Sequence, residues 1–329
     1  MMPEFNGGAT LLEAVAYGDA AGLPVETWTR ARIAERHGRI DRLLPSNENP
    51  FFIGTFEPGV WSDDTQLSIA VARALAQANG FNIAALVETH IEAFDETPEV
   101  EFKGRTIKRG WGRSTMTALN RLKRGVSPDE SGLIGGAGNG ILMKLSPLAY
   151  WHNERGIGDE ERYANDDELT LMTHNSPEAF VTTRVHDDVL QSILTNGYNV
   201  DAFIETATNS AAWHELQFHA EPITSEALSY LHRRVSEKDI LRHTDAKGFH
   251  APQTLAMAYG ALIAHRARFK ESVYGSVSLG GDTDSIASIV AAMSLCADSS
   301  QRLPDDSDRL DRRYELRAHS EALVKAARS

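Results

Sequence analysis

The chain has 329 residues, of which 42% are hydrophobic, and a formal net charge of −13. This composition is ordinary for a globular protein and supplies enough apolar side chains for a sizeable core. The acidic balance argues against non-specific binding to nucleic acid, because such a surface repels phosphate, and a site for a dianionic ligand would have to bring its own positive charge.

Helical periodicity dominates the sequence, and alternating runs rich in Val, Ile and Thr are nearly absent. Residues 65–77, for example, place Leu67, Val71 and Leu75 on one face of a helix. Gly, Pro, Asn and Asp between such runs end helices and form turns. We therefore expect an all-α fold with little or no sheet. The expected helices span residues 65–77, 84–94, 114–122, 178–194, 202–212, 225–235, 252–269 and 285–297.

The last segment, residues 305–329, is highly charged but carries four apolar residues that could bring one face of a final helix against the core. No repeat with a solenoid period and no Pro/Ser-rich linker divides the sequence. We therefore expect residues 1–329 to form one compact domain that ends in a charged helix. The four apolar residues of that helix are Leu310, Tyr314, Leu316 and Leu323.

Cys296 is the single cysteine and lies in an apolar run, which favours a buried, unreactive thiol. One cysteine allows no internal disulfide, which fits a reducing compartment. The first residues show no signal-peptide pattern, and no stretch approaches the roughly 18 consecutive apolar residues of a membrane span. These features predict a cytoplasmic protein with no membrane partner.

Two acidic clusters each precede a strongly helical run. Helix capping explains one such cluster, because Ser and Asp are favoured at N-caps and Asp near the positive end of the helix dipole. Together, however, the clusters offer four carboxylates and two hydroxyls, which suit Mg²⁺, Mn²⁺ or Ca²⁺ better than Zn²⁺. Four neighbouring carboxylates would repel one another without cations. The clusters consist of Ser62, Asp63 and Asp64, and of Asp282, Asp284 and Ser285.

Two glycine-containing segments add further candidates. Residues 135–140 are rich in glycine, and such turns expose backbone N–H groups that can hold a diphosphate, although many are only flexible loops. Lys144 follows closely and is a candidate phosphate partner. Residues 17–26 end an apolar helix and place Asp19 and Glu26 beside glycines.

Five motifs occur in an order that resembles the ADP-ribosylglycohydrolase family, which includes the bacterial dinitrogenase reductase-activating glycohydrolases. The resemblance covers about residues 11–297, and its most diagnostic part is the Gly-Gly-Asp-Thr-Asp element. It implies a compact all-α fold that holds two Mg²⁺ or Mn²⁺ ions, in agreement with the helical periodicity. The motifs are Gly18-Asp-Ala-Ala-Gly-Leu-Pro-Val-Glu26, Trp61-Ser-Asp-Asp-Thr-Gln66, Gly138-Asn-Gly140 with Met143, Thr173-His174, and Leu279-Gly-Gly-Asp-Thr-Asp-Ser-Ile-Ala287.

The resemblance implies a role for each matching residue. One side of the metal centre would be built by Ser62, Asp63 and Asp64, and the other side by Asp282, Asp284 and Ser285. Glu26 falls on the acidic position near the reacting ribose, which makes it a catalytic candidate beside Asp64 and Asp282.

For the substrate, the resemblance places Gly138, Asn139 and Gly140 on the diphosphate loop. Lys144 stands where an Arg is common, so a bidentate phosphate contact would be lost there. His174 matches a family position that either contacts substrate or braces a turn. Phe249 could stack on a base or ribose, or simply pack.

The implied activity is hydrolysis of the glycosidic bond at C1 of an ADP-ribosylated protein or a small ADP-ribose conjugate. This reaction passes through an oxocarbenium-like transition state, and a water activated by two metal ions would attack C1 while a carboxylate such as Glu26 orients that water. The nitrogenase-regulating members carry an Asp in the segment matching Arg109-Gly110-Trp111-Gly112, where this chain has no acid, so the leaving group stays open.

Two alternatives belong to other functional classes. A two-metal phosphohydrolase acting on a nucleotide-like substrate would use a similar set of ligands. A catalytically silent ADP-ribose-binding member would keep the fold without turnover, but the full set of six ligand side chains argues against loss of the site. The products released from a conjugate distinguish these alternatives from a glycohydrolase.

Overall fold

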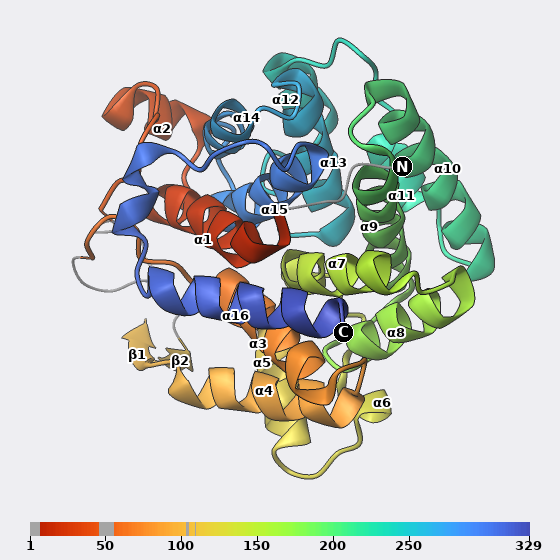
Figure 1. Ribbon diagram of the computed structural model, residues 1–329. Coiled ribbons are helices and arrows are strands. Elements are labelled where there is room, and N and C mark those ends of the chain that lie inside the picture. Colours follow the sequence, from red (N-terminus) through yellow and green to blue (C-terminus); the bar gives the residue numbers. More distant parts are fainter. Residues whose placement is uncertain (1–6, 46–55, 103–104, 109) are drawn as a thin grey trace.

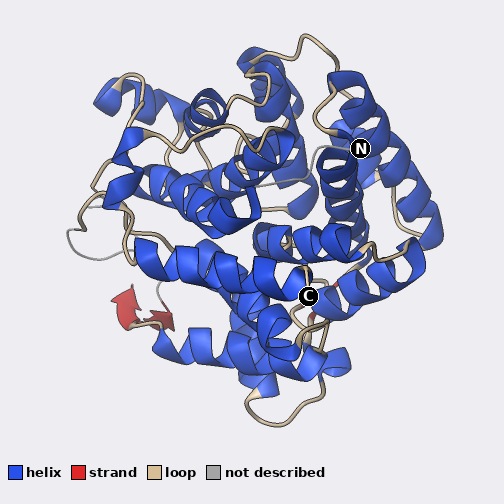
Figure 2. Cartoon of the chain, in the orientation of Figure 1, coloured by secondary structure: helices blue, strands red, loops and turns tan. Residues whose placement is uncertain are grey.

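Among the residues that the structure describes, the strands form two short pairs and helices predominate (Figure 2). The computed structural model describes residues 7–45, 56–102, 105–108 and 110–329. In these ranges β1 (Glu99–Phe102) pairs antiparallel with β2 (Arg105–Lys108), and β3 (Leu133–Ile134) pairs in parallel with β4 (His174–Asn175). The expected all-α fold with little sheet is confirmed.

Side chains at the N-caps explain where several helices begin. The hydroxyl of Ser62 accepts a hydrogen bond from the backbone N–H of Asp64, and Asn82 and Ser176 cap the starts of two other helices. Such caps satisfy N–H groups that the first turn leaves unpaired. The α-helices of the described residues are α1 (Leu11–Gly22), α2 (Arg30–His37), α3 (Asp63–Ala78), α4 (Ile83–Glu96), α5 (Arg113–Leu122), α6 (Pro128–Ser131), α7 (Ser146–Arg155), α8 (Asp159–Leu171), α9 (Pro177–Asn196), α10 (Val200–Gln217), α11 (Ile223–Leu228), α12 (Glu237–His243), α13 (Ala251–Ala264), α14 (Phe269–Val277), α15 (Thr283–Ala297) and α16 (Arg313–Ala327). The 3₁₀ helices are η1 (Gly7–Thr10), η2 (Leu23–Val25), η3 (Asn139–Lys144) and η4 (Asp305–Arg309).

Helices from the two ends of the sequence, α1 and α15, lie side by side at the centre of the molecule (Figure 1). Glycines make this close approach possible. A Cβ on Gly18 would lie 2.1 Å from the carbonyl oxygen of Ala287, and one on Gly22 would lie 2.2 Å from that of Thr283. Because both obstacles are backbone atoms, only glycine fits. The first glycine motif therefore brings Asp19 beside the start of α15.

The charged C-terminal segment forms η4 and α16, and α16 packs against α3 and η1. Leu310, Leu316 and Leu323 are buried as expected, but Tyr314 is 90% exposed, so its expected docking is wrong. Tyr314 precedes Leu316 by two residues, and two residues turn an α-helix by more than half a revolution. Its side chain therefore points to solvent while the leucines face the core.

One expected helix, residues 225–235, is too long. In the structure α11 ends at Leu228, and the following turns still bury Leu231 and Val235. A capping box formed by Ser236 and Asp239 then starts α12. The apolar spacing continues through the turn because the turn packs on the core, and periodicity alone did not show the break.

A second expected helix, residues 252–269, is also too long. Its first part, α13, ends at Ala264, and Arg266 and Ala267 adopt positive φ angles of 57° and 53°. A right-handed helix cannot continue through this conformation, which side chains other than glycine seldom adopt. The chain resumes as α14 at Phe269.

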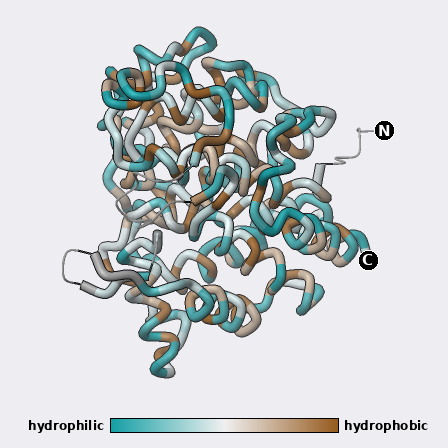
Figure 3. The backbone as a smooth tube through the Cα atoms, turned by 90° about the vertical axis from the view of Figure 1, so that its left-hand side faces the viewer, coloured by the Kyte–Doolittle hydropathy of each residue, from teal (hydrophilic) through white to brown (hydrophobic). Residues whose placement is uncertain are grey.

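The hydropathy of the chain follows this packing. Hydrophilic segments lie along much of the periphery (Figure 3), and α13 and α15 are buried along nearly their whole lengths. Cys296 is buried, and this burial raises the pKa of its thiol to about 12, which makes it a poor nucleophile. Among the described helices, none is long and apolar enough to cross a membrane.

Candidate functional site

A cavity of about 740 Å³ brings together most of the residues that the sequence motifs single out. Their motifs are far apart in the chain, and they converge because α3 and α15 both begin at this cavity. Two predicted residues, Ser62 and Lys144, do not line it. The predicted residues in its wall are Glu26, Asp63, Asp64, Gly138, Asn139, Gly140, His174, Phe249, Asp282, Asp284 and Ser285.

Five carboxylates at one end of this site form two overlapping groups. The first consists of Asp19, Asp64 and Asp284, and the second of Glu26, Asp282 and Asp284. Within each group, one oxygen atom from every residue lies within 4.8 Å of the others. Asp284 belongs to both groups, and all five residues are buried. Each group suits one hard divalent cation.

Asp19 is the member of this set to which the sequence reasoning gave no role. Its carboxylate accepts hydrogen bonds from the backbone N–H groups of Ser62 and Thr65 and from the Thr65 hydroxyl, at 2.6 to 3.1 Å. It therefore holds the start of α3 against α1. Ser62 in turn donates its hydroxyl hydrogen bond to Asp64 at 3.0 Å. The signal for Asp19 was its place in the first glycine motif.

The second acidic motif is shaped by the two glycines before it. Gly280 and Gly281 have φ angles of +82° and +84°, and a Cβ on Gly281 would lie 2.3 Å from the carbonyl oxygen of Lys247. These constraints require glycine and give the sharp bend expected before Asp282. The backbone N–H of Asp282 then donates to the Lys247 carbonyl at 2.7 Å, which fixes the start of α15.

Electrostatics in this cleft favour protons or cations. Burial, together with the charge of Asp64, raises the pKa of Asp19 to about 8 and that of Asp282 to about 7, and burial raises the pKa of Asp64 to about 6. The pKa values of Asp63 and Asp284 also lie well above the ordinary range, because of burial and the neighbouring carboxylates. Compensation by a divalent cation fits this set of oxygen donors.

The glycine-rich loop contacts the cavity differently from the sequence expectation. The side-chain N–H of Asn139 donates to Asp282 at 2.7 Å, and its backbone N–H donates to the Phe249 carbonyl at 3.2 Å. The side-chain nitrogen also donates to the Gly248 carbonyl at 3.1 Å, so both the side-chain and the backbone donors of Asn139 are engaged within the protein, and this residue orients a carboxylate. Gly138 has an ordinary φ of −73°, and a Cβ there would meet nothing closer than 3.9 Å, so its small size leaves room in the cavity.

Lys144 must be corrected as a direct phosphate ligand. Its ammonium is fully buried, 3.3 Å from the Thr173 hydroxyl and 3.4 Å from Nε2 of His90, and burial lowers its pKa to about 7. Lys144 is the last residue of η3 and does not line the cavity. The Thr173 hydroxyl accepts from Lys144, which leaves its proton for Nδ1 of His174 at 2.8 Å.

That arrangement assigns the proton of His174 to Nε2, the ring nitrogen nearest the glycine loop. His174 is neutral, because burial and the charge of Lys144 lower its pKa to about 3. It lines the cavity and also belongs to β4, so it both braces the chain and faces the ligand space. Phe249 is 44% exposed and lies on the same wall.

The sequence reasoning also missed the positive charge that the cavity contains. Lys108 and Arg113 both line it, and Arg113 begins α5, whose positive helix end faces the same space. Lys108 donates to the Thr97 carbonyl at 2.8 Å. Gly110, Trp111 and Gly112 of the segment that lacks the family acid also line the cavity, whereas Arg109 lies outside the described residues.

Comparison with known proteins agrees with this geometry. The family model described as ADP-ribosylglycohydrolase matches residues 10–329. An uncharacterized protein from Archaeoglobus fulgidus is 25% identical over 85% of this chain and 83% of its own length. An ADP-ribosylarginine hydrolase from Serratia proteamaculans is 22% identical over 84% of this chain and 67% of its own length. An ADP-ribosyl-[dinitrogen reductase] glycohydrolase from Rhodospirillum rubrum is 26% identical over 66% of this chain and 67% of its own length.

A solved structure named as an ADP-ribosylglycohydrolase-related protein complex superposes with a TM-score of 0.74. It covers 98% of both chains at 22% sequence identity. At this identity the match shows that the two chains share a fold.

Proposed function

Because the chain belongs to the ADP-ribosylglycohydrolase family, we propose that it hydrolyses the glycosidic bond at C1 of an ADP-ribosylated protein or a small ADP-ribose conjugate. The observation that carries the proposal is the pair of buried carboxylate groups that share Asp284 at the wall of a cavity. The cavity volume of about 740 Å³ falls within the range of small-molecule sites.

The donor set fits two Mg²⁺ or Mn²⁺ ions. Asp19, Asp64 and Asp284 would hold one ion, and Glu26, Asp282 and Asp284 would hold the other. Bound ions would supply Lewis acidity and offset the buried negative charge. We retain three further residues as proposed ligands, because they lie beside these carboxylates: Ser62, Asp63 and Ser285.

The protein's own groups would position the reacting atoms. Glu26 lines the cavity from the loop after η2, and we propose that it accepts a proton from the attacking water. Its closeness to Asp282 and Asp284 favours contact with an ion as well, in addition to the position near the reacting ribose that the family resemblance implies. Asn139 holds Asp282 in place, as a supporting residue around a metal ligand does.

The remainder of the cavity would bind the ADP-ribosyl group. Gly138 and Gly140 leave space beside His174, whose Nε2–H can donate to a substrate oxygen. We propose that Arg113 and the N-terminus of α5 supply the positive charge for the diphosphate that Lys144 does not. Phe249 provides an aromatic face for the base or ribose.

The test is a panel of ADP-ribose conjugates on arginine, serine and small acceptors, each assayed with Mg²⁺, Mn²⁺ or excess chelator. The proposal predicts release of free ADP-ribose from at least one conjugate, abolished by the chelator and restored by metal. Asp298→Asn, an exposed change at the other end of α15, is the matched control for Asp282→Asn. Release of AMP or phosphate would indicate a phosphohydrolase, and binding without any turnover would indicate a silent member; either result would overturn the proposal.

A further inference from the structure

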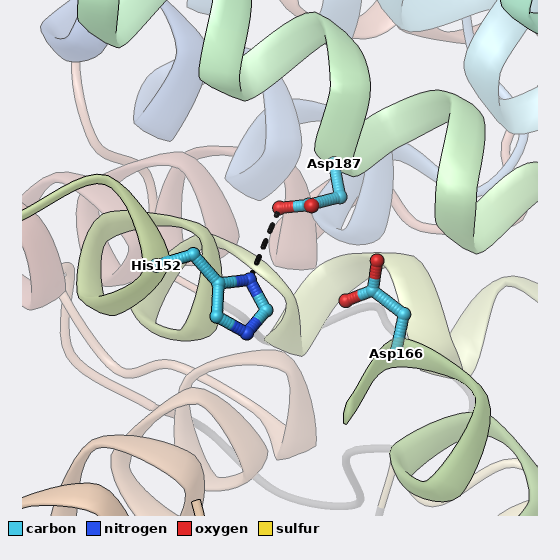
Figure 4. Close-up of side chains that lie close together, drawn as sticks. All are labelled: His152, Asp166 and Asp187. Atoms are coloured by element: carbon cyan, nitrogen blue, oxygen red, sulfur yellow. Dashed lines mark ion pairs between the residues drawn. The ribbon is translucent and has the colours of Figure 1, made fainter. Parts of the chain in front are cut away.

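A second group of potential metal ligands lies away from the cavity, where three consecutive helices meet (Figure 4). His152 comes from α7, Asp166 from α8 and Asp187 from α9. One ligand atom from each residue lies within 4.8 Å of the other two, and all three side chains are buried. None of the three lines the cavity.

The carboxylate of Asp166 has an unusual environment. The residue is fully buried, yet among the described residues no hydrogen-bond partner reaches either of its oxygen atoms. Nδ1 of His152 also has none, and its ion-pair distance to Asp187 is a long 3.8 Å. Figure 4 shows the carboxylate of Asp166 facing the space between these two side chains. A buried carboxylate without a partner is costly, and a proton on Asp166 would leave its own hydroxyl without an acceptor.

The charged side chains around His152, Asp166 and Asp187 carry more negative than positive charge. Three carboxylates meet here, those of Asp166, Asp187 and Asp188, and Arg162 pairs with the last two. With Asp166 ionised, these three carboxylates and Arg162 sum to −2, which one divalent cation balances. Because the carboxylates are buried, an uncompensated charge of this size would be strongly unfavourable.

We propose that Nδ1 of His152 and the carboxylates of Asp166 and Asp187 bind one divalent transition-metal ion of the zinc class. An imidazole ligand favours zinc over Mg²⁺ or Ca²⁺, which prefer oxygen donors alone. This site is independent of the ions proposed for the cavity, where every side-chain donor is an oxygen atom. The ion would tie α7, α8 and α9 together and serve the fold.

The surroundings of the three ligands fit this assignment. The side-chain nitrogen of Asn165 lies 3.2 Å from Nε2 of His152. A half turn of the amide exchanges its nitrogen and oxygen, and the proposal requires the turned amide, whose oxygen accepts the Nε2–H and leaves Nδ1 free to bind metal. Arg162 and Gln191 donate to Asp187 and hold its carboxylate in position. Metal ligands in proteins are commonly oriented by such partners.

The experiment uses the full chain, expressed in zinc-supplemented medium so that the ion is present while the buried site folds. An anomalous difference map collected at the zinc edge is decisive. The proposal predicts a peak within bonding distance of His152, Asp166 and Asp187. A map without that peak would overturn it, whatever is bound in the cavity.

Variants provide the solution test. Asp166→Asn keeps the shape and removes one ligand charge, and Asp167→Asn, whose side chain pairs with Arg184 near the surface, is the matched control. Asp166→Asn should hold one zinc ion per chain fewer than the control, and its melting temperature in chelator should equal or exceed that of the chelated wild type. Equal zinc content in both variants would contradict the proposal. Asp282→Asn should keep this zinc ion, so failure at one site is distinguishable from failure at the other.

Discussion

The protein contains two buried acidic regions, one at the cavity and one between α7, α8 and α9, and their negative charge is compensated in different ways. At the cavity, the carboxylates of α1, α3 and α15 meet hydroxyls, backbone N–H groups and one another, and the pKa values of Asp19 and Asp282 rise to about 8 and 7, mainly because of burial. Between α7, α8 and α9, burial acts in the same direction on Asp187, but the pair with the buried guanidinium of Arg162 outweighs it and holds the pKa of Asp187 below its ordinary value.

The pKa difference distinguishes a structural ion pair, between α7, α8 and α9, from a ligand-binding site, at the cavity. A carboxylate that meets a buried guanidinium is compensated within the protein, and its removal harms the fold. The aspartates beside the cavity accept hydrogen bonds from hydroxyl, amide and backbone N–H groups rather than from a buried guanidinium, so what the cavity binds would compensate their charge. Asp166 lies in the region between α7, α8 and α9, but among the described residues no partner compensates its carboxylate, which is why we assign it to a metal.

Matched substitutions in the two regions should have opposite effects. Asp187→Asn leaves Arg162 with a weakened buried pair, so we expect the free energy of unfolding to fall by about 3–5 kcal/mol, while turnover at low temperature persists. Asp282→Asn should reduce turnover at least about 100-fold, because it removes a proposed metal ligand. In chelator it should leave stability equal to or above that of the wild type, because it removes a buried charge.

Denaturant unfolding in chelator and initial rates with Mg²⁺ or Mn²⁺ measure both quantities. If Asp282→Asn proved as destabilising as Asp187→Asn in the metal-free protein, the two acidic regions would not differ in the way described.

The pH dependence of the metal-free protein sharpens the comparison. Asp64, Asp282 and Asp19 have folded-state pKa values of about 6, 7 and 8, above the 3.8 of an ordinary aspartate. The folded state therefore binds these protons more tightly than the unfolded state. Their contribution to stability is fully present below about pH 4 and is lost as the pH rises through 6 to 8.

We therefore expect the melting temperature in chelator to fall between pH 5 and pH 8.5, and saturating Mg²⁺ or Mn²⁺ to reduce that fall. The contribution of Asp187 to stability has the opposite dependence on pH. Its lowered pKa stabilises the folded state above about pH 4, and this contribution is lost as the pH falls toward 2. Metal-free stability that rises from pH 5 to pH 8.5 would show that the cleft carboxylates are already compensated.

Substitutions at two glycines with the same backbone conformation test whether substrate binding requires a small residue in the cavity wall. Gly138 has φ and ψ of −73° and 162°, and Gly158, at the N-cap of α8, has −75° and 160°. Gly138→Val would project a side chain into the cavity beside His174, and we expect KM to rise about tenfold. Gly158→Val has open space around it and should leave KM unchanged. Equal KM values in both variants would remove the glycine loop from the binding site.

The smallest expected effect concerns Lys144, a cation that lies close to the cavity but does not face it. Lys144→Met keeps the length of the side chain and removes the charge. We expect KM to change by much less than the roughly tenfold that loss of a charged hydrogen bond to phosphate would cause. If KM rises by that amount or more in Lys144→Met and is unchanged in Arg113→Met, Lys144 and not Arg113 binds the phosphate.

Local features of the fold and the site could be read from the sequence, and long-range ones could not. Asp282 and Asp284 follow two glycines whose positive φ angles make the bend, so the acidic residues and the glycines that position them are neighbours in the sequence. Asp19, in contrast, caps a helix 43 residues away, and neither partner alone reveals the contact. The positions of helices followed their apolar spacing, but the break at Arg266 and Ala267 left no mark in that spacing.

The sequence also did not reveal the direction in which the Lys144 side chain points. Lys144 follows the glycine loop in sequence, but η3 turns its ammonium toward His90. The ligands His152, Asp166 and Asp187 come from three helices without a shared motif, and only the packing of α7, α8 and α9 brings them together.

We propose that the cleft binds two divalent ions through carboxylate groups that share Asp284. The most direct measurement is an anomalous difference map at the manganese edge, from crystals of the full chain grown with Mn²⁺. Two bound ions would give two peaks, one contacted by Asp19 or Asp64 and the other by Asp282 or Glu26, with Asp284 between them. A map at saturating Mn²⁺ with no peak at these carboxylates, or with one peak that does not touch Asp284, would contradict it.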